Sequence, residues 1–390
     1  MSGLDLIKVI PFFAPATQFG GVVSQAARLC ALLAHRGHRV RVVTTDNRVP
    51  TTIPRGQWVD RDGYQVYYSP TRPWNRIPPY WTPSFGPALD EAMESADLCC
   101  LNVGLTLANR IAARIASRHG VPFIYNAEGA LCPTRLRIKG WRKRAFLTWI
   151  EKPLLAQASA CHATTTKEAQ DLEAQGVPPD RVFQIPNGVQ LEGSGDPAKF
   201  RKRFGIPTDA PILLFLGRLH AIKGLELLVR AFAEAGLPEA RLVVAGHDED
   251  GTGARVRPHI AALGLEDRIL FTGHLDGDDR LDSLAAATAF GLASRSEGLP
   301  NAALEALAAG LPCVLTRECN LPEVAEADAG YVLPAKVERF AEALRTLLSD
   351  PSEQSRMGDN AKRLVAKRFA LGSVADQLEE VYSSVASQET

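Results

Sequence analysis

Strand-like and helix-like segments alternate along the whole chain, and this alternation restricts the possible folds more than any other feature. Short β-branched or apolar runs such as "LIKVIPFF", "HRVRVVTT" and "PILLFLG" are separated by amphipathic stretches that predict helices over residues 22–36, 107–119, 225–235 and 337–349. Strands that alternate with helices form parallel sheets covered by helices on both faces. The pattern therefore predicts an α/β protein with doubly wound parallel sheets.

The length predicts more than one domain, because 390 residues exceed what one ordinary core accommodates. A break is expected in "IPNGVQLEGSGDPAKF", residues 185–200, which is rich in turn-forming Pro, Gly, Asn and Asp. Ligands of open parallel sheets bind at the carboxyl ends of the strands. We therefore expect two domains that face a ligand-binding cleft.

Composition and cysteine usage bear on where the protein works. Apolar residues make up 46% of the chain and charged residues 23%, an ordinary mixture for a soluble globular protein. Asp5 and Lys8 interrupt the first apolar run, no cleavage site follows it, and no apolar stretch approaches the roughly 20 residues that span a bilayer. The seven cysteines contain no CxxC pair, which indicates free thiols in a reducing cytosol. A cytoplasmic protein is expected.

The segment "SEGLPNAALEALAAGLP", residues 296–312, contains two carboxylates around an Ala- and Leu-rich helix. Glu305 has no cationic residue three or four positions away, and an unpaired buried carboxylate is costly unless it has a purpose. One interpretation is a surface helix on which Glu305 faces solvent. The other is that Glu305 binds a polyol such as a ribose, Glu297 binds a second polyol, and the turn between them offers N–H groups to an anion.

Two further loops have the composition of phosphate-binding sites. In "LLFLGRLHAIKGLELLVRAF", residues 213–232, Arg218 and Lys223 follow a buried strand and could bind a diphosphate, or could be solvated loop cations. Near the N-terminus, Gly20 and Gly21 separate a strand from a helix, either as a tight turn or so that a ligand can approach the backbone. This loop is not the GxGxxG dinucleotide motif, which argues against a nicotinamide enzyme.

Together these three segments resemble the family 4 retaining glycosyltransferases, whose fold is GT-B. "IPNGV" resembles the interdomain hinge of that family, and "GLPCVLT" followed by "AGYVL" resembles its closing strands. The resemblance implies a Rossmann-like acceptor-binding domain over residues 1–187 and a Rossmann-like donor-binding domain over residues 188–370. It also implies that a C-terminal helix, about 371–387, packs back on the first domain.

The resemblance implies a role for each motif residue. Glu297 would contact the transferred sugar and Glu305 the ribose, while Arg218 and Lys223 would bind the diphosphate and stabilise it as it leaves. The transfer would retain configuration, need no metal or cofactor, and use no assigned nucleophile, because the nucleotide-diphosphate sugar is itself a substrate. The loops 246–253 and 273–276 would border the base. The rest of the implied donor-binding set is Gly21, Gly217, Gly246, His274, Leu275, Gly298, Leu299 and Asn301.

Residues 125–172 resemble a subgroup that assembles surface polysaccharides such as O-antigen. Where that subgroup has Pro-Arg-Gly, this chain has Ala127-Glu128-Gly129, so the charge at Glu128 is reversed. Glu128 is a candidate for orienting the acceptor hydroxyl or the donor sugar. His162 in "CHATTT" is expected to be structural, because the histidines show no metal spacing.

A basic and aromatic stretch lies within the same segment, over residues 135–150. It predicts docking on an anionic membrane surface, although a solvated helix face and nucleic acid are alternatives, and no nucleic-acid recognition module accompanies it. The charge of the first half favours docking, because residues 1–189 carry 22 Lys and Arg against 14 Asp and Glu, or +8, whereas residues 190–390 carry 22 against 30, or −8. Its charged and aromatic members are Arg135, Arg137, Lys139, Trp141, Arg142, Lys143, Arg144, Phe146 and Trp149.

Three Asp-x-Asp pairs are candidate metal ligands, because another glycosyltransferase fold holds a metal with such a pair. All three are interpreted as turns, so no metal site is expected. The pairs are Asp60 with Asp62, Asp248 with Asp250, and Asp276 with Asp278.

The predicted function is sugar transfer from a nucleotide-diphosphate sugar to a glycan acceptor, lipid-linked, in polysaccharide or O-antigen biosynthesis at the inner face of the cell membrane. One alternative is transfer to a small soluble acceptor such as a sugar phosphate. Another is a sugar-nucleotide binder without catalytic activity.

Overall fold

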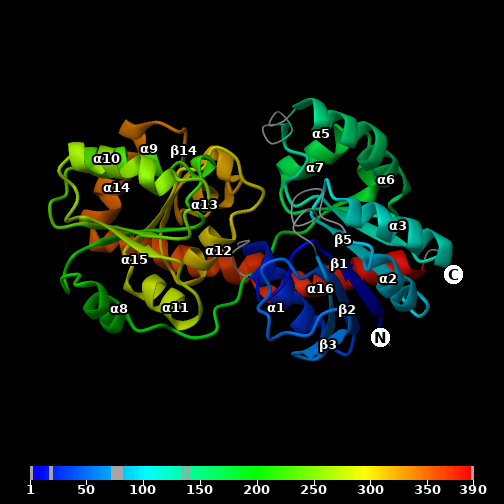
Figure 1. Cartoon of the computed structure of the whole chain (residues 1–390). Coiled ribbons are helices and arrows are strands. Elements are labelled where there is room, and N and C mark those ends of the chain that lie inside the picture. The colour runs from blue at the N-terminus through cyan, green and yellow to red at the C-terminus, as the bar shows by residue number, and fades with distance from the viewer. Residues whose placement is uncertain (1–2, 17–20, 72–81, 134–135, 137–139, 388–390) are drawn as a thin grey trace. The chain divides into compact units, whose positions relative to one another are not determined.

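The structure is a computed structural model that describes residues 3–16, 21–71, 82–133, 136 and 140–387. The chain forms two compact units (Figure 1). Unit 1 contains residues 1–188 and 371–390, and unit 2 contains residues 189–370. Each unit is built around one sheet of Rossmann-like topology, which confirms the fold predicted from the strand and helix alternation.

The sheet of unit 1 has eight strands in the described part of the chain, in the order β3-β4-β2-β1-β5-β6-β7-β8. Every pairing is parallel except that of β3 with β4. These two form a hairpin around Asp62 and Gly63, both of which have positive φ. The strands are β1 (Asp5–Val9), β2 (Arg39–Thr45), β3 (Trp58–Arg61), β4 (Tyr64–Ser69), β5 (Leu98–Asn102), β6 (Phe123–Asn126), β7 (Ala160–Ala163) and β8 (Val182–Gln184).

The helices of unit 1 include the C-terminal helix α16, which packs against α1. Val374 and Leu378 share a hydrophobic cluster with Ala26 and Leu29 of α1. At the end of α1, Nη1 of Arg36 lies 2.7 Å from carboxylate oxygens of both Asp376 and Glu379. The helices are α1 (Gly21–His35), α2 (Phe85–Met93), α3 (Leu107–His119), α5 (Gly140–Phe146), a π-helix (Leu147–Glu151), α6 (Lys152–Gln157), α7 (Thr166–Glu173), a 3-10 turn (Pro179–Arg181) and α16 (Leu371–Ser387).

The sheet of unit 2 has six strands within the described residues, all parallel, in the order β11-β10-β9-β12-β13-β14. The central strand β9, of sequence ILLFL, is buried along its whole length, as expected for a strand covered on both faces. The strands are β9 (Ile212–Leu216), β10 (Arg241–Ala245), β11 (Ile269–Gly273), β12 (Ala289–Leu292), β13 (Cys313–Thr316) and β14 (Gly330–Leu333).

The helices of unit 2 connect these strands and bury their apolar faces in one hydrophobic core. The helices predicted from amphipathic spacing are confirmed in both units as α1, α3, α9 and α14. Unit 2 contains α8 (Pro197–Phe204), a 3-10 turn (Ala221–Lys223), α9 (Leu225–Ala235), α10 (Thr252–Ala262), α11 (Gly277–Ala286), α12 (Asn301–Ala308), a 3-10 turn (Arg317–Cys319), α13 (Glu323–Glu326), α14 (Val337–Ser349), α15 (Pro351–Leu364) and a π-helix (Val365–Phe369).

Candidate active site

The loop between β9 and α9 brings a lysine close to the end of the neighbouring strand β12. His220 caps the 3-10 turn, and its Nδ1 accepts a hydrogen bond from the N–H of Ile222 at 3.1 Å. Gly224 follows with φ of 67°, and a Cβ there would lie only 1.9 Å from the carbonyl oxygen of Ala293. Only glycine therefore allows this close approach, which places Lys223 beside the loop that follows β12.

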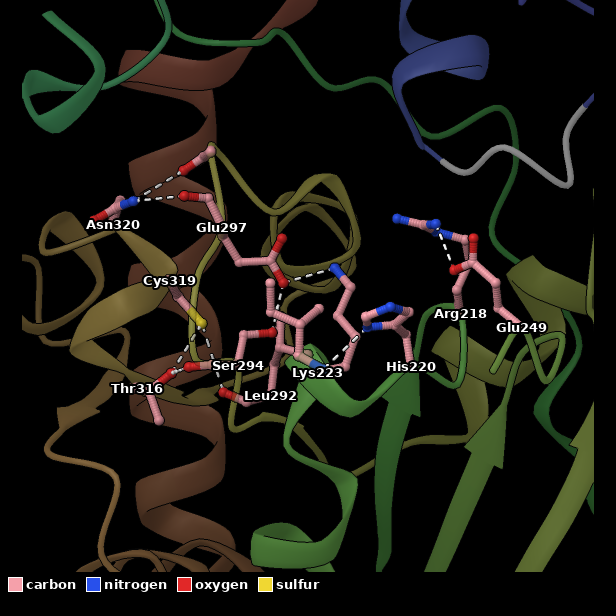
Figure 2. A network of polar contacts seen from close by, with 12 residues as sticks. Arg218, His220, Lys223, Glu249, Leu292, Ser294, Glu297, Thr316, Cys319 and Asn320 are labelled. Atoms are coloured by element: carbon pink, nitrogen blue, oxygen red, sulfur yellow. Dashed lines mark hydrogen bonds and ion pairs between the residues drawn. The ribbon is translucent and has the colours of Figure 1, made fainter. Parts of the chain in front are cut away.

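Lys223 and Glu297 form an ion pair that joins these two loops (Figure 2). Nζ of Lys223 lies 2.6 Å from Oε1 of Glu297, and the hydroxyl of Ser294 donates to the same oxygen. Glu297 is only 8% exposed. Two motif residues that are 74 positions apart in the sequence thus meet at the carboxyl ends of adjacent strands.

The backbone of the same turn is held by Asn320, which follows β13. Nδ2 of Asn320 donates to the carbonyl oxygens of Glu297 at 2.7 Å and Gly298 at 3.4 Å. The N–H of Glu297 donates in turn to the carbonyl of Glu318 at 3.0 Å. Asn320 has φ of 54°, a left-handed conformation that Asn tolerates better than most residues. Figure 2 shows the amide of Asn320 directed at this turn.

Glu305 is buried, as the sequence predicted. Its neighbours along the helix suggested that it has no cationic partner, and this inference is wrong. Glu305 lies on α12 and is 5% exposed. Nε of Arg280, on α11, lies 2.6 Å from its Oε2, and Nη2 of Arg280 contacts the same oxygen. The partner comes from another helix, 25 positions away, so an inspection at helical spacing could not find it.

Arg218 makes a different contact from the one between Lys223 and Glu297. Its Nη1 lies 2.6 Å from Oε2 of Glu249, and both side chains are more than a third exposed. The two loops are held side by side because the N–H of Leu219 donates to His247 and that of Glu249 donates to Leu219. Exposed ion pairs contribute about 0–1 kcal/mol, so an anionic ligand could replace Glu249 at little cost.

The other predicted donor-site residues of unit 2 lie in loops at the same edge of the sheet. A Cβ at Gly246 would lie 1.7 Å from the carbonyl oxygen of Gly217, so these two loops touch through their backbones. Leu275 is 4% exposed and packs in the core, and its role in donor binding stays a prediction. His274 is exposed, Leu299 packs partly on the core, and Gly298 and Asn301 flank the start of α12.

Unit 1 contributes two predicted residues. Gly21 is the first residue of α1, whereas Gly20 lies outside the described residues. Glu128 follows β6 with φ of 51°, its N–H donates to Oδ1 of Asn126 at 3.1 Å, and its Oε1 accepts from Nδ2 of Asn126 at 3.2 Å. It lines a cavity of about 40 Å³ together with Lys8, Gln25, Asn102, Asn126, His162 and Asn187.

His162 is engaged by the protein on both ring nitrogens. Nε2 lies 2.7 Å from the carbonyl oxygen of Ile185, and Nδ1 lies 3.3 Å from Nδ2 of Asn126. The ring stacks on Phe183, with centroids 4.9 Å apart. Burial lowers the pKa of His162 to about 4, so the ring is neutral at physiological pH. These contacts give His162 a structural role.

From Gly140 onward the basic segment forms α5 and most of the π-helix, and α6 follows it. Trp141 and Trp149 are 75% and 77% exposed, which is exceptional for such large apolar groups. Arg144, Thr148 and Lys152 are exposed at spacings of four residues along the same helical run. Arg135, Arg137, Lys139 and the side chain of Arg142 lie outside the described residues.

The Asp-x-Asp pairs lie in turns or at helix starts. Asp250 accepts hydrogen bonds from Thr252 and from the N–H of Ala221, and these bonds outweigh its partial burial and lower its pKa to about 2. Asp276 precedes α11. Within the described residues, His, Cys, Asp and Glu side chains nowhere gather in a group of three that could hold a metal ion. None of the described helices is long and apolar enough to cross a bilayer.

Sequence reasoning missed four residues that contact the side chain or backbone of a motif residue, namely Arg280, Asn320, Ser294 and Glu249. Each of them either follows a different strand from the motif residue that it contacts, or lies in a turn with no distinctive sequence. Only Ser294 offered a signal, because it stands three positions before Glu297 at the end of a buried strand.

Comparisons with known proteins agree over most of the chain. The family model for glycosyl transferases group 1 matches residues 196–364, and that for the glycosyl transferase 4-like domain matches residues 20–188. The D-inositol 3-phosphate glycosyltransferase of Stackebrandtia nassauensis is 28% identical over 389 residues, covering 93% of this chain and 86% of that protein. D-inositol 3-phosphate glycosyltransferase 1 of Catenulispora acidiphila is 31% identical over 297 residues, covering 71% of this chain and 70% of that protein.

Solved structures share the fold over nearly the whole chain. Sucrose-phosphate synthase from Thermosynechococcus elongatus has a TM-score of 0.78 at 20% identity and covers 98% of this chain and 99% of its own. HepE of Anabaena in complex with UDP-glucose has a TM-score of 0.78 at 19% identity and covers 98% and 100%. The strand order, the loops that carry the motif residues and these matches together show that the chain belongs to the family 4 glycosyltransferases of the GT-B fold.

Proposed function

We propose that this glycosyltransferase moves a sugar from a nucleotide-diphosphate sugar to a small soluble acceptor that bears a phosphate. The observation that carries the donor half is the pairing of Lys223 with Glu297 at the ends of adjacent strands, with Arg218 in the same loop. The acceptor half is supported by the relatives, which are named for D-inositol 3-phosphate. Small phosphorylated polyols and sugars are therefore the acceptor class to test first.

On the donor side, separate residues are proposed to bind the sugar, the diphosphate and the ribose. Glu297 accepts hydrogen bonds from hydroxyls of the transferred sugar, and Glu305 accepts them from the ribose, because an ionised carboxylate only accepts. Lys223 and Arg218 bind the diphosphate, Arg218 by exchanging Glu249 for phosphate oxygens. Backbone groups of Gly217, Gly246, Gly298, Leu299 and Asn301 complete this side.

The chemistry proposed is cleavage of the bond between the sugar and the diphosphate with retention of configuration and without a metal. Negative charge develops on the leaving diphosphate, and fixed cations aimed at it lower the barrier without reorganisation. Lys223 is well suited, since its side chain is 17% exposed and already held by Glu297 and the loop. No protein nucleophile is assigned.

On the acceptor side, the side chains that line the cavity of unit 1 have suitable chemistry for the hydroxyls and phosphate of a phosphorylated polyol, although a volume of about 40 Å³ does not enclose the whole molecule. Its amide side chains, from Gln25, Asn102, Asn126 and Asn187, can exchange hydrogen bonds with hydroxyls. Lys8 lines the same cavity and has no hydrogen-bond or ion-pair partner within the described residues, so its charge is available to a phosphate. Glu128 lines the same cavity and is proposed to orient an acceptor hydroxyl.

Two measurements test the proposal. A thermal-shift panel of nucleotide-diphosphate sugars identifies the donor without requiring the acceptor, and a stabilising shift with at least one of them is expected. Transfer is then measured to sugar and polyol phosphates and to their dephosphorylated forms, with the phosphorylated forms preferred. Donor binding without hydrolysis or transfer to any acceptor would indicate a silent binder, and equal use of dephosphorylated acceptors would contradict the phosphate requirement.

A lipid-linked acceptor is the second candidate, and the exposed tryptophans favour it. Trp141, Arg144, Trp149 and Lys152 form an aromatic and cationic stripe, and the one acid among residues 140–157, Glu151, is buried. Such a stripe suits the interface of an anionic membrane, at which the enzyme would extend a polysaccharide precursor on the inner face. This candidate predicts co-sedimentation with vesicles that contain anionic lipid, lost in Trp141→Ser/Trp149→Ser. If the protein does not co-sediment with these vesicles, the lipid-linked candidate is contradicted and the soluble acceptor remains.

A further inference from the structure

The contact between Arg280 and Glu305 links two helices that follow different strands of unit 2. Arg280 lies on α11, after β11, and Glu305 lies on α12, after β12. Nε and Nη2 of the guanidinium both contact Oε2 of the carboxylate, with the Nε distance at 2.6 Å. The Glu305 side chain is 7% exposed and that of Arg280 is 28% exposed, so the carboxylate is buried and the guanidinium reaches the surface.

This contact brings a positive charge to Glu305, which α12 itself does not supply. The rest of α12 is Ala, Leu and Asn, so a buried carboxylate there would be costly without a cation. Arginine is suited to the task because its planar guanidinium stays charged and can hold a carboxylate through two N–H groups at once. The contact therefore orients Glu305.

The guanidinium retains further donors. The guanidinium of Arg280 has five N–H groups, and within the described part of the chain their only acceptor is Glu305. The remaining N–H groups are left for water or for a ligand beside Glu305. An arginine that only linked α11 to α12 would not need to contact the motif carboxylate of Glu305.

We propose that Arg280 is a positioning residue that holds the Glu305 carboxylate oriented to accept hydrogen bonds from the ribose hydroxyls of the donor. This inference rests on the proposed function, which places the ribose at Glu305. It goes beyond the motif, because Arg280 stands outside it in "GDDRLDSL". Its consequence is that selectivity for ribose over deoxyribose depends on a residue that contacts the nucleotide only through Glu305.

The test compares a ribonucleoside diphosphate, chosen from the thermal-shift panel, with its 2′-deoxy analogue. Calorimetry on the whole protein is expected to show that the wild type prefers the ribonucleotide by about tenfold or more, the scale of a hydrogen bond to a charged group. Arg280→Met should lower the affinity for the ribonucleotide by about tenfold and leave that for the deoxy analogue nearly unchanged. Arg280→Lys should restore most of the preference.

A matched control separates positioning from a structural tie. Arg203→Met removes another ion pair of α11, in which Nη1 of Arg203 lies 2.6 Å from Asp279, without touching Glu305. This variant should keep the ribose preference. Equal losses for both nucleotides in Arg280→Met, or a loss of preference in Arg203→Met, would overturn the proposal.

The remaining outcomes distinguish the proposal from the function on which it rests. A wild type that binds nucleotide sugars but does not discriminate ribose from deoxyribose would remove the ribose from Glu305, and with it the role of Arg280, while leaving the transferase function intact. A wild type that binds no nucleotide sugar would overturn both.

Discussion

Lys223 and Glu297 stand 2.6 Å apart, Nζ to Oε1, so the side chain proposed for the diphosphate and the one proposed for the transferred sugar are paired with each other. Both are largely buried, with side chains 17% and 7% exposed. A pair of this kind fixes the relative position of two loops that only the strand order brings together. The two residues should therefore behave as one functional unit.

Replacing either member should reduce turnover strongly, and the double replacement should cost little more than either single one. Lys223→Met removes the cation that pairs with buried Glu297 and that stabilises the leaving group, so kcat should fall by about 100-fold or more. Glu297→Gln should lower kcat on a similar scale. Steady-state kinetics of the singles and Lys223→Met/Glu297→Gln measure the coupling. Fully additive losses would contradict a shared role.

Arg218→Ala should mainly lower turnover. The side chain is exposed and its contact with Glu249 contributes little stability, so the fold should be unaffected. Loss of a cation at the leaving diphosphate should reduce kcat by about 100-fold, with a much smaller change in KM for the donor. The measurement is kcat and KM together with a thermal midpoint.

Arg339→Ala is a suitable control for Arg218→Ala, because Arg339 also pairs with an exposed acid, Glu342, in the same unit. It should leave both kinetic constants unchanged. A rise in donor KM in Arg218→Ala without any loss of kcat would instead indicate uniform binding and count against leaving-group stabilisation.

Most of the fold was predictable because it depends on local patterns. The amphipathic spacing of residues 107–119 and 225–235 predicts α3 and α9 with the same bounds that the structure has. The hairpin at Asp62 follows from a polar turn between two short alternating strands. The hydrophobic period of a helix or a strand is set by its own residues, so no distant information is needed.

The candidate site was predictable only as a set of separate motifs. The burial of Glu305 follows from its apolar neighbours, but its partner Arg280 lies in a segment rich in aspartate that has the composition of a solvated helix. The pairing of Lys223 with Glu297 requires β9 to lie next to β12, which the order of strands along the chain does not determine. The sequence therefore does not predict the contacts between loops that follow different strands of the sheet.

Asn320 should matter for activity although it belongs to no motif. Asn320→Gly keeps the left-handed backbone but removes the hydrogen bonds to the carbonyl groups of Glu297 and Gly298, so kcat/KM should fall by about tenfold with a stability loss of about 1 kcal/mol. Asn320→Ala should lose a further 1 kcal/mol or so, since a Cβ without a polar group is disfavoured at φ of 54°. Kinetics and denaturant unfolding of both variants measure the two effects. Wild-type kcat/KM in Asn320→Gly would show that the turn needs no such support.

His162 should make the protein less stable as the pH falls below neutrality. Burial lowers the pKa of His162 from 6.5 to about 4, and the charge of Lys8 acts in the same direction. Above pH 6.5 the imidazole is neutral in both the folded and the unfolded chain, so it contributes no pH dependence there. Between pH 6.5 and about 4 the unfolded chain binds the proton more readily, so stability decreases as the pH falls, by up to about 3 kcal/mol.

The contribution of His162 can be isolated with a variant that does not titrate. His162→Gln keeps a side-chain donor for the carbonyl of Ile185 but cannot gain a charge in this range. Denaturant midpoints of the two proteins are compared from pH 7.5 to pH 4.5. The midpoint of His162→Gln minus that of the wild type should be lowest at pH 7.5 and should rise progressively as the pH falls. Carboxylates titrate in both proteins and cancel in the comparison. A difference that stays constant with pH would mean that His162 accepts a proton as readily in the folded protein as in the unfolded chain.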